Sequence, residues 1–512
     1  MIPTALRTAK NALLLSCGIA LFGAAPLLFS LGALQAHSIN NGGYRNAADS
    51  LAVDSLLLQA QRYPQARRDS ALMVAKLAVK KIRESIIGDA HRDLAFALRE
   101  VGRLGLNQGK LDEAEQALRQ SLAMTQALYP PGDTAIADVT DYLARAVRLQ
   151  GRFNEAETLY QQALLLKRGI YKTDDPELAG GMNNLALLLK TMGRYRQADT
   201  LYREALAMKW RIYNSDHEDL ATGLLNIGSL HLEQGKLQEA SSYLDSAVAM
   251  LNRLGVERPL LAATVAMRAM AWERGGCASR ALPLAEDALR IRRKLFPPTH
   301  PATAASLLQL ANLRIAEGDL DAAQLLADTA LAMRRSLYAT EGDHPEIAGA
   351  LVVAAKIARL RHRFADADTM IAPAVAMLRR IYPEGSFTTV AAMDELGRLR
   401  TAQQRYGEAE QTLNEASALA RTIGDPDNPA AALLLFHRAE VYRATNRPML
   451  ATDYLRRSVA LYQQLGAELF SDAIEARQLL VQVLRGANNN AEANAVQAEV
   501  QKLQQQQQMA CQ

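Results

Sequence analysis

The 512-residue sequence predicts an all-α fold, a solenoid built from antiparallel helix pairs. Helix-favouring Ala, Leu, Glu, Gln and Arg dominate long stretches, whereas the β-branched residues typical of strands are thinly scattered. A glycine-centred motif recurs at intervals close to 42 residues. Between its copies, apolar residues follow one another at spacings of three and four, which is typical of amphipathic helices.

The period is the strongest of these signals, because a repeat of fixed length determines the whole architecture. The string Gly-Lys-Leu-Asp-Glu-Ala at 109–114 is followed by related strings that begin at Gly151, Gly193 and Gly235. Six further turn positions continue the register, so the sequence predicts ten repeats within residues 91–503. These six are Gly276, Gly318, His362, Gln404, Asn446 and Gly486.

Small residues flank every predicted turn. Gly or Ala stands seven positions before the turn residue in the first nine repeats, and Ala stands five positions after it in all ten. Two antiparallel helices approach closely only where the side chain between them is small. We therefore expect these positions to lie at the contact within each helix pair. The alanines are Ala114, Ala156, Ala198, Ala240, Ala281, Ala323, Ala367, Ala409, Ala451 and Ala491.

Local signals set the bounds of each element, as the third repeat illustrates. Pro176 suits the first turn of a helix, and Gly193 suits the left-handed turn after its end. The second helix follows at once and ends near Tyr213. Loops rich in Pro and Asp, such as 342–346, separate one repeat from the next.

This pattern resembles the tetratricopeptide repeat. The 42-residue period and the Asp-His-Pro-Glu loop at 343–346 are similar to the longer subtype of kinesin light chains and bacterial relatives. The resemblance implies a right-handed superhelix whose first helices form a concave surface that receives a peptide or helix of a partner. Departures concentrate after residue 350, where the turn glycine is lost three times. The residues that carry the resemblance are Ala186, Gly193, Tyr195, Ala198, Tyr202 and Ala205.

The ends of the chain differ from the repeats. Residues 44–90 predict a degenerate helix pair that caps the solenoid, preceded by a linker at 37–43. A glutamine-rich tail, low in complexity, occupies residues 504–512.

Residues 1–36 are predicted to form a signal-anchor, with a cleaved signal peptide as the alternative. The uncharged stretch 12–34 has 23 residues, enough to cross a bilayer, whereas the apolar region of a signal peptide usually has about 7–15 residues. Arg7 and Lys10 precede the stretch, and positive flanks stay in the cytoplasm. Both alternatives place the repeats in the periplasm or outside the cell, either membrane-anchored or secreted.

Composition argues against several function classes. Lys and Arg number 58 and Asp and Glu 54, and the net charge of +4 is spread along the chain without the concentrated basic stripe of a nucleic-acid binder. Cys17, Cys277 and Cys511 are too few and too scattered for a disulfide framework or a zinc site. We therefore expect no nucleic acid and no cofactor.

Catalytic chemistry is not expected either. His217, His300 and His344 recur in loops near the start of a helix, but none has a second His or Cys at metal-ligand spacing. The anchor, cap and repeats fill residues 1–503 and leave no stretch for a catalytic domain. The sequence predicts no enzyme, no catalytic or metal site and no small-molecule substrate.

The resemblance instead implies a non-catalytic scaffold that binds proteins outside the cytoplasmic membrane. The alternative is a sensory or regulatory subunit whose output lies on a separate chain. Residues six and three positions before the turn border the concave face in the family, and there eight basic residues face only Glu273 and Glu440. An acidic peptide is one expected partner, whereas chance clustering on a solvated face is the alternative. The predicted groove residues are Arg103, Arg145, Arg148, Lys190, Lys356, Arg359, Arg398 and Arg443.

Overall fold

The computed structural model describes residue 44 and residues 47–62, 68–86, 91–255, 258–339, 342–424, 427–466 and 471–511. Over these residues the secondary structure consists of 22 α-helices and one isolated backbone bridge, between Tyr44 and Ile86. The helices are α2 (Ala47–Arg62), α3 (Arg68–Ser85), α4 (Arg92–Asn107), α5 (Leu111–Leu128), α6 (Thr134–Leu149), α7 (Phe153–Ile170), α8 (Pro176–Thr191), α9 (Tyr195–Ile212), α10 (Glu218–Glu233), α11 (Leu237–Arg253), α12 (Pro259–Arg274), α13 (Ala278–Leu295), α14 (Pro301–Ala316), α15 (Leu320–Leu337), α16 (Pro345–Leu360), α17 (Phe364–Ile381), α18 (Phe387–Ala402), α19 (Tyr406–Ile423), α20 (Pro429–Ala444), α21 (Pro448–Gln464), α22 (Ser471–Gly486) and α23 (Asn490–Cys511).

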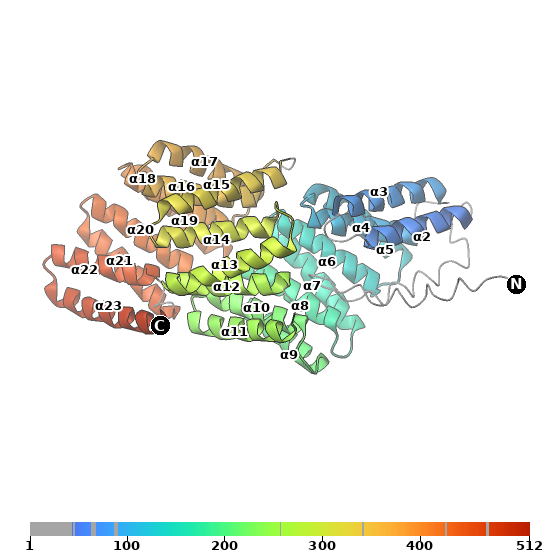
Figure 1. Cartoon of the computed structure of the whole chain (residues 1–512), viewed down its shortest axis with the longest axis horizontal. Helices are drawn as coiled ribbons and strands as arrows, with labels where there is room; N and C mark the ends of the chain where they lie inside the picture. Colours follow the sequence, from blue (N-terminus) through green and yellow to red (C-terminus); the bar gives the residue numbers. More distant parts are fainter. Residues whose placement is uncertain are drawn as a thin grey trace.

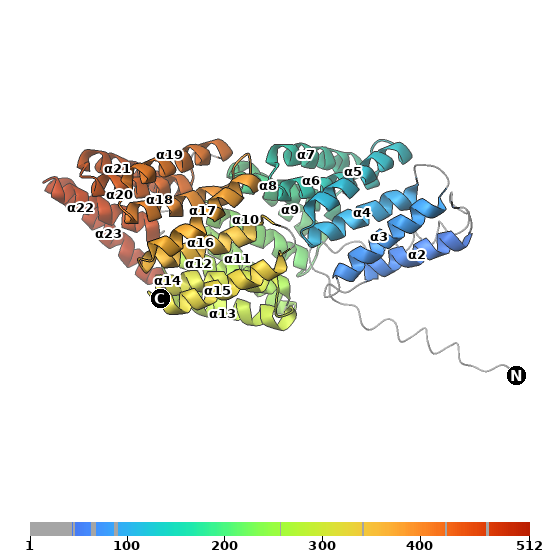
Figure 2. The same ribbon diagram turned by 90° about the horizontal axis from the view of Figure 1, so that it is seen from above.

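Successive helices form antiparallel pairs that stack into a solenoid (Figure 1). Each even-numbered helix packs most extensively on the odd-numbered helix that follows it, and that helix then packs on the next pair. Seen from above, α2 to α5 lie at one end of the molecule and α20 to α23 at the other (Figure 2). The prediction of an all-α solenoid of helix pairs is confirmed, whereas the right-handed sense of its superhelix stays a prediction.

The tight turns within the pairs follow the predicted register except in the last repeat. Gly109 has a left-handed φ of 78°, and the same conformation recurs at the next eight predicted turn positions, including His362, Gln404 and Asn446. In the last pair the left-handed residue is Asn488, so the prediction of Gly486 was wrong by two positions. Gly486 ends α22, and a turn at Asn488 restores the spacing of 42 from Asn446.

Close helix contact explains the small residues. The nine predicted alanines from Ala114 to Ala451 are at most 1% exposed, and in the corrected register Ala493, with 0%, takes the place of Ala491. A β-carbon added to Gly397 would lie 2.6 Å from the side chain of Leu413 on the paired helix. Larger side chains at these positions would therefore force the two helices apart.

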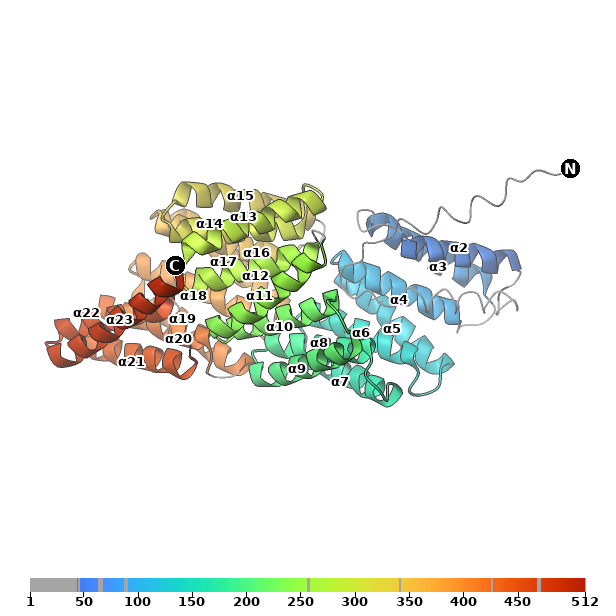
Figure 3. The same ribbon diagram turned by 60° about the horizontal axis from the view of Figure 1, so that its bottom comes forward.

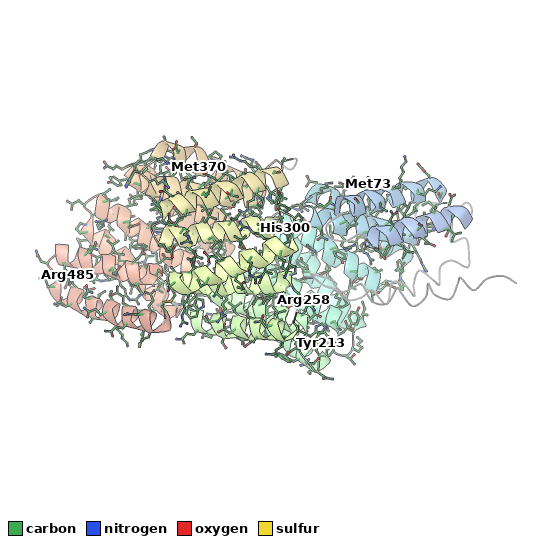
Figure 4. All side chains as sticks on the ribbon, in the orientation of Figure 1. Met73, Tyr213, Arg258, His300, Met370 and Arg485 are labelled. Carbon is green, nitrogen blue, oxygen red and sulfur yellow. A yellow bond between two sulfur atoms is a disulfide. The ribbon has the colours of Figure 1, made fainter. Side chains whose placement is uncertain are left out.

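Histidines begin several of the helices, in a role that sequence spacing did not reveal. Each accepts a hydrogen bond at Nδ1 from the backbone N–H two residues later, at 3.1 to 3.2 Å, and so caps the helix. Three of the rings also stack on the aromatic residue that ends the preceding helix, with centroids 3.5 to 3.8 Å apart. Figure 4 labels one of them, His300, between α13 and α14. The caps are His91, His217, His300 and His344.

Successive turns of the superhelix contact one another, because segments far apart in sequence meet along one line. Tyr382 packs on Gly151, Gly424 on Gly193 and Gln507 on Gly276, and in each pair the residues are 231 positions apart. One turn of the superhelix therefore contains about five and a half repeats. The short loop between the two helices of one pair consequently meets the end of a helix that lies in the next turn of the superhelix. We call this line of contacts the seam.

The contacts along the seam change from apolar to polar towards the C-terminal end. The rings of Phe153 and Tyr382 stack with centroids 5.9 Å apart, and Leu237 packs against buried Tyr462 and Ala473. At the C-terminal end the contacts are polar. There Gln507 Nε2 donates to the carbonyl oxygen of Gly275 at 2.7 Å.

A disulfide joins Cys277 to Cys511, with Cα atoms 5.3 Å apart, at this end of the seam. Figure 3 shows the end of α23 beside α11 and α12, although 234 positions separate the two cysteines. The prediction that the cysteines are too scattered to pair was wrong for these two. Spacing along the chain could not reveal the pair, because the pitch of the superhelix brings the residues together.

The predicted membrane segment at 12–34 lies outside the described residues. None of the described helices is long and apolar enough to span a membrane.

Candidate partner-binding surface

The even-numbered helices line the inner side of the superhelix. From α4 to α22, each packs on the next even-numbered helix as well as on its own partner. In a curved stack, elements on the inside of the curve approach one another most closely. We call the surface of these helices the inner face; all eight predicted groove residues lie on them, on α4, α6, α8, α16, α18 and α20.

Arg145, Arg148 and Lys190 form one basic group on α6 and α8, and Arg274 on α12, which pairs with Glu233 at 3.5 Å, lies nearby. Burial lowers the pKa of Lys190, and the nearby charges of Arg148 and Arg274 lower it further, against the opposing effect of Glu233. Burial also lowers the pKa of Arg145, with Arg148 as the next cause. These cations thus lie close enough to repel one another. A bound anionic group would relieve that repulsion.

The hydrogen bonds of this group are mostly to neutral partners. Arg145 Nη2 donates to Asn107 Oδ1 at 3.2 Å, and Lys190 Nζ donates to Ser229 Oγ at 2.8 Å. Arg148 lies beside Tyr160, but its Nε is buried without a hydrogen-bond partner among the described residues. Asp141, which Asn184 binds at 2.8 Å, is the nearest acid on α6.

The second basic group, on α16 and α18, is largely neutralised. Glu395 accepts two hydrogen bonds from Arg359, at 2.5 and 3.3 Å, and lies 3.8 Å from Arg398. Burial raises the pKa of Glu273 to about 7, with Lys356 and Arg274 opposing the rise. Burial lowers the pKa of Lys356, because it disfavours the charged ammonium just as it disfavours the charged carboxylate of Glu273. Acids and bases here satisfy one another, so this group offers little free positive charge.

The two remaining predicted residues are separate from both groups. Arg103 donates from Nε and Nη2 to Glu100 at 2.9 and 2.7 Å, and Arg443 is exposed at the end of α20. The count of eight bases against two acids therefore overstated the charge. Glu100 and Glu395 stand nine positions before the turn residue of their repeats. That is one helical turn before the positions six and three residues ahead of the turn residue, so a comparison that included this position would have found both acids.

The part of the chain that the structure describes contains no group of three His, Cys, Asp or Glu residues that could hold a metal ion. The recurring histidines use Nδ1 for capping, as described above.

Helix pairs of uniform length, stacked in register and closed by left-handed turns, define a helical-repeat solenoid. Two profiles of the tetratricopeptide repeat match the sequence, one at residues 133–209, 261–336 and 388–464 and the other at 94–134 and 220–254. Together they cover more than half of the chain. The chain belongs to the tetratricopeptide repeat family, as the resemblance predicted.

Several solved structures are similar to this chain. The TPR-like repeats of a kinesin light chain from Podosopora anserina are 20% identical, with a TM-score of 0.32, over 41% of this chain and 98% of that one. A Rap protein complexed with Competence and Sporulation Factor is 12% identical, with a TM-score of 0.45, over 78% of this chain and 99% of that one. Apo RapI is also 12% identical, with a TM-score of 0.45, over 56% and 99%. No curated protein sequence matches the chain.

Proposed function

We propose that the chain is a non-catalytic scaffold that binds an acidic segment of another protein, a peptide or a helix, on the inner face of its solenoid. The observation that carries this proposal is the basic group of Arg145, Arg148 and Lys190. Its charges repel one another, and Arg145 and Lys190 donate hydrogen bonds to the neutral side chains of Asn107 and Ser229. Carboxylates of a partner would form charge-assisted hydrogen bonds with it.

The location outside the cytoplasmic membrane is part of the same proposal. Disulfides persist mainly in oxidising compartments, and Cys277 and Cys511 are joined. Arg7 and Lys10 ahead of residues 12–34 support the same orientation. If the segment is an uncleaved anchor, protein from membranes should keep Met1 and resist high-salt extraction. A mature amino terminus at His37 on released protein would instead favour cleavage.

Charge reversal tests the binding surface. A triple variant with Arg145→Glu, Arg148→Glu and Lys190→Glu should capture the native partner at least about tenfold less well at low salt, because attraction becomes repulsion. Its capture should also lose the decline with salt that the unchanged protein shows. Circular dichroism establishes that the variant is folded.

A matched control changes the same charge elsewhere. Arg196, Arg293 and Arg335 are exposed on the odd-numbered helices α9, α13 and α15, and their reversal to Glu should leave capture unchanged. If both triple variants capture the partner normally, the acidic-segment proposal fails. A kinase or a transcription regulator as the captured partner would support a regulatory subunit in place of an assembly scaffold.

A further inference from the structure

Cys277 and Cys511 lie where the seam changes from apolar to polar contacts. Earlier points of the seam are apolar, as at Phe153 and Tyr382 or around Leu237. Among the residues that the structure describes, two hydrogen bonds join the last point, from Gln507 Nε2 to the carbonyl oxygen of Gly275 at 2.7 Å and from Ser471 Oγ to that of Arg274 at 3.5 Å. Exposed or half-buried hydrogen bonds of this kind add little net stability.

We propose that the disulfide is a redox-controlled clasp that holds the last helix, α23, closed against the α12–α13 turn, and that its reduction opens this end of the superhelix. The two cysteines are 234 positions apart, so the bond ties the end of the chain to a turn more than five repeats earlier, and reduction removes this covalent link. The other seam contacts stay in place, which confines the opening to this end.

The exposure of the two cysteines sets the direction of reduction. Cys277 is 2% exposed, whereas Cys511 is half-buried near the end of α23. A thiolate of an external dithiol therefore attacks the sulfur of Cys511, forming a mixed disulfide and releasing Cys277, which takes up a proton. The second thiol of the dithiol then displaces Cys511. The protein ends with two thiols, and the dithiol, having supplied two electrons and two protons, ends as a disulfide.

Close packing at the turn brings the two cysteines together. Gly276 has a φ of 75°, and a β-carbon there would collide with the amide of Gln507 and lie 3.1 Å from Ser471 Oγ. The absence of a side chain lets α23 approach the turn closely enough for the two sulfur atoms to bond. This fit does not depend on which partner the inner face binds.

Hydrogen exchange of the full chain, oxidised and after reduction with dithiothreitol, tests the clasp. Reduction should speed exchange at 490–511 at least about tenfold and leave α4 and α5, towards the other end of the chain, unchanged. The variant Cys511→Ala should exchange without reductant as the reduced protein does. Unchanged exchange at 490–511 in both cases would overturn the proposal.

The polar contact supplies a matched variant. Gln507→Ala removes the hydrogen bond to Gly275 but keeps both cysteines. It should exchange like the unchanged protein while oxidised, and faster than the unchanged protein once reduced, because only then does the hydrogen bond hold this end. If Gln507→Ala opens the oxidised protein as fully as Cys511→Ala does, the disulfide is no clasp. Peptide mapping without reductant that finds both cysteines as thiols in native protein would also overturn the proposal.

Discussion

Single residues along the seam decide how closely successive superhelical turns approach. Gly151 and Gly318 both occupy left-handed turns, with φ of 81° and 82°. A β-carbon on Gly151 would lie 2.5 Å from the ring of Tyr382, whereas one on Gly318 would meet nothing within 4 Å. The sequence motif is the same at both turns, so the pattern predicts the backbone conformation but not the neighbour that arrives from 231 positions later.

The two glycines therefore form a matched pair for mutation. Gly318→Ala should cost about 1 kcal/mol, the usual penalty of a left-handed alanine. Gly151→Ala should cost about 2–4 kcal/mol, because overpacking against Tyr382 adds to that penalty. Urea unfolding followed by circular dichroism measures both. Equal costs would show that Tyr382 does not contact this turn in solution.

The cap at His344 should make the start of α16 sensitive to acid. Burial, with nearby Arg334 as the second cause, lowers the pKa of His344 to about 4, and its Nδ1 must stay unprotonated to accept from the N–H of Glu346. As the pH falls, His344 takes up a proton near pH 6.5 in the unfolded chain but only near pH 4 in the folded chain. Stability from this group is therefore complete above pH 6.5 and decreases as the pH falls towards 4.

Replacing the imidazole tests this pH dependence. His344→Asn keeps a capping side chain but cannot take up the proton. Hydrogen exchange at the start of α16 should accelerate between pH 6.5 and 4 in the unchanged protein, after correction for the intrinsic rate, and not in the variant. The same pH response in both proteins would assign the effect to another group.

Helix pairs were the most predictable elements. Period, turn and small-residue positions predicted the turns of nine repeats, because each repeat contacts mainly its neighbours and carries its own local signals. The tenth was misplaced because Gly486 offered a glycine two positions before the true turn, Asn488. A terminal repeat has a neighbour on one side only, so its sequence is less constrained.

Turn chemistry predicts where the solenoid opens first. His362 and Gln404 adopt φ of 58° and 61°, which costs a residue with a side chain about 1 kcal/mol relative to glycine. Hydrogen exchange should therefore be faster between 350 and 460 than between 100 and 240. His362→Gly and Gln404→Gly should slow it locally, and Asn446→Gly should do so less, since Asn tolerates this conformation. Slower exchange in 350–460 than in 100–240 would contradict this account.

At the scale of the whole molecule, closure of the superhelix was beyond prediction. The pitch of the superhelix depends on small rotations between neighbouring repeats. These rotations add up over about five and a half repeats, and their total cannot be deduced from any residue pattern in the sequence. The same limit applies to the candidate site. The residue register predicted that these residues lie on the first helix of each pair, but the pairing of Arg359 with Glu395, and the proximity of Arg145, Arg148 and Lys190, required the geometry.

The central claim is that a protein partner binds the inner face, and site-specific photocrosslinking in intact cells tests it most directly. Benzoylphenylalanine in place of Tyr142, on α6 beside the basic group, preserves an aromatic side chain. Leu165, 72% exposed on α7, is the outer control position. The account predicts a partner adduct from position 142 that disappears when Arg145, Arg148 and Lys190 are reversed to Glu, and none from position 165. An adduct from position 165 alone would contradict the claim.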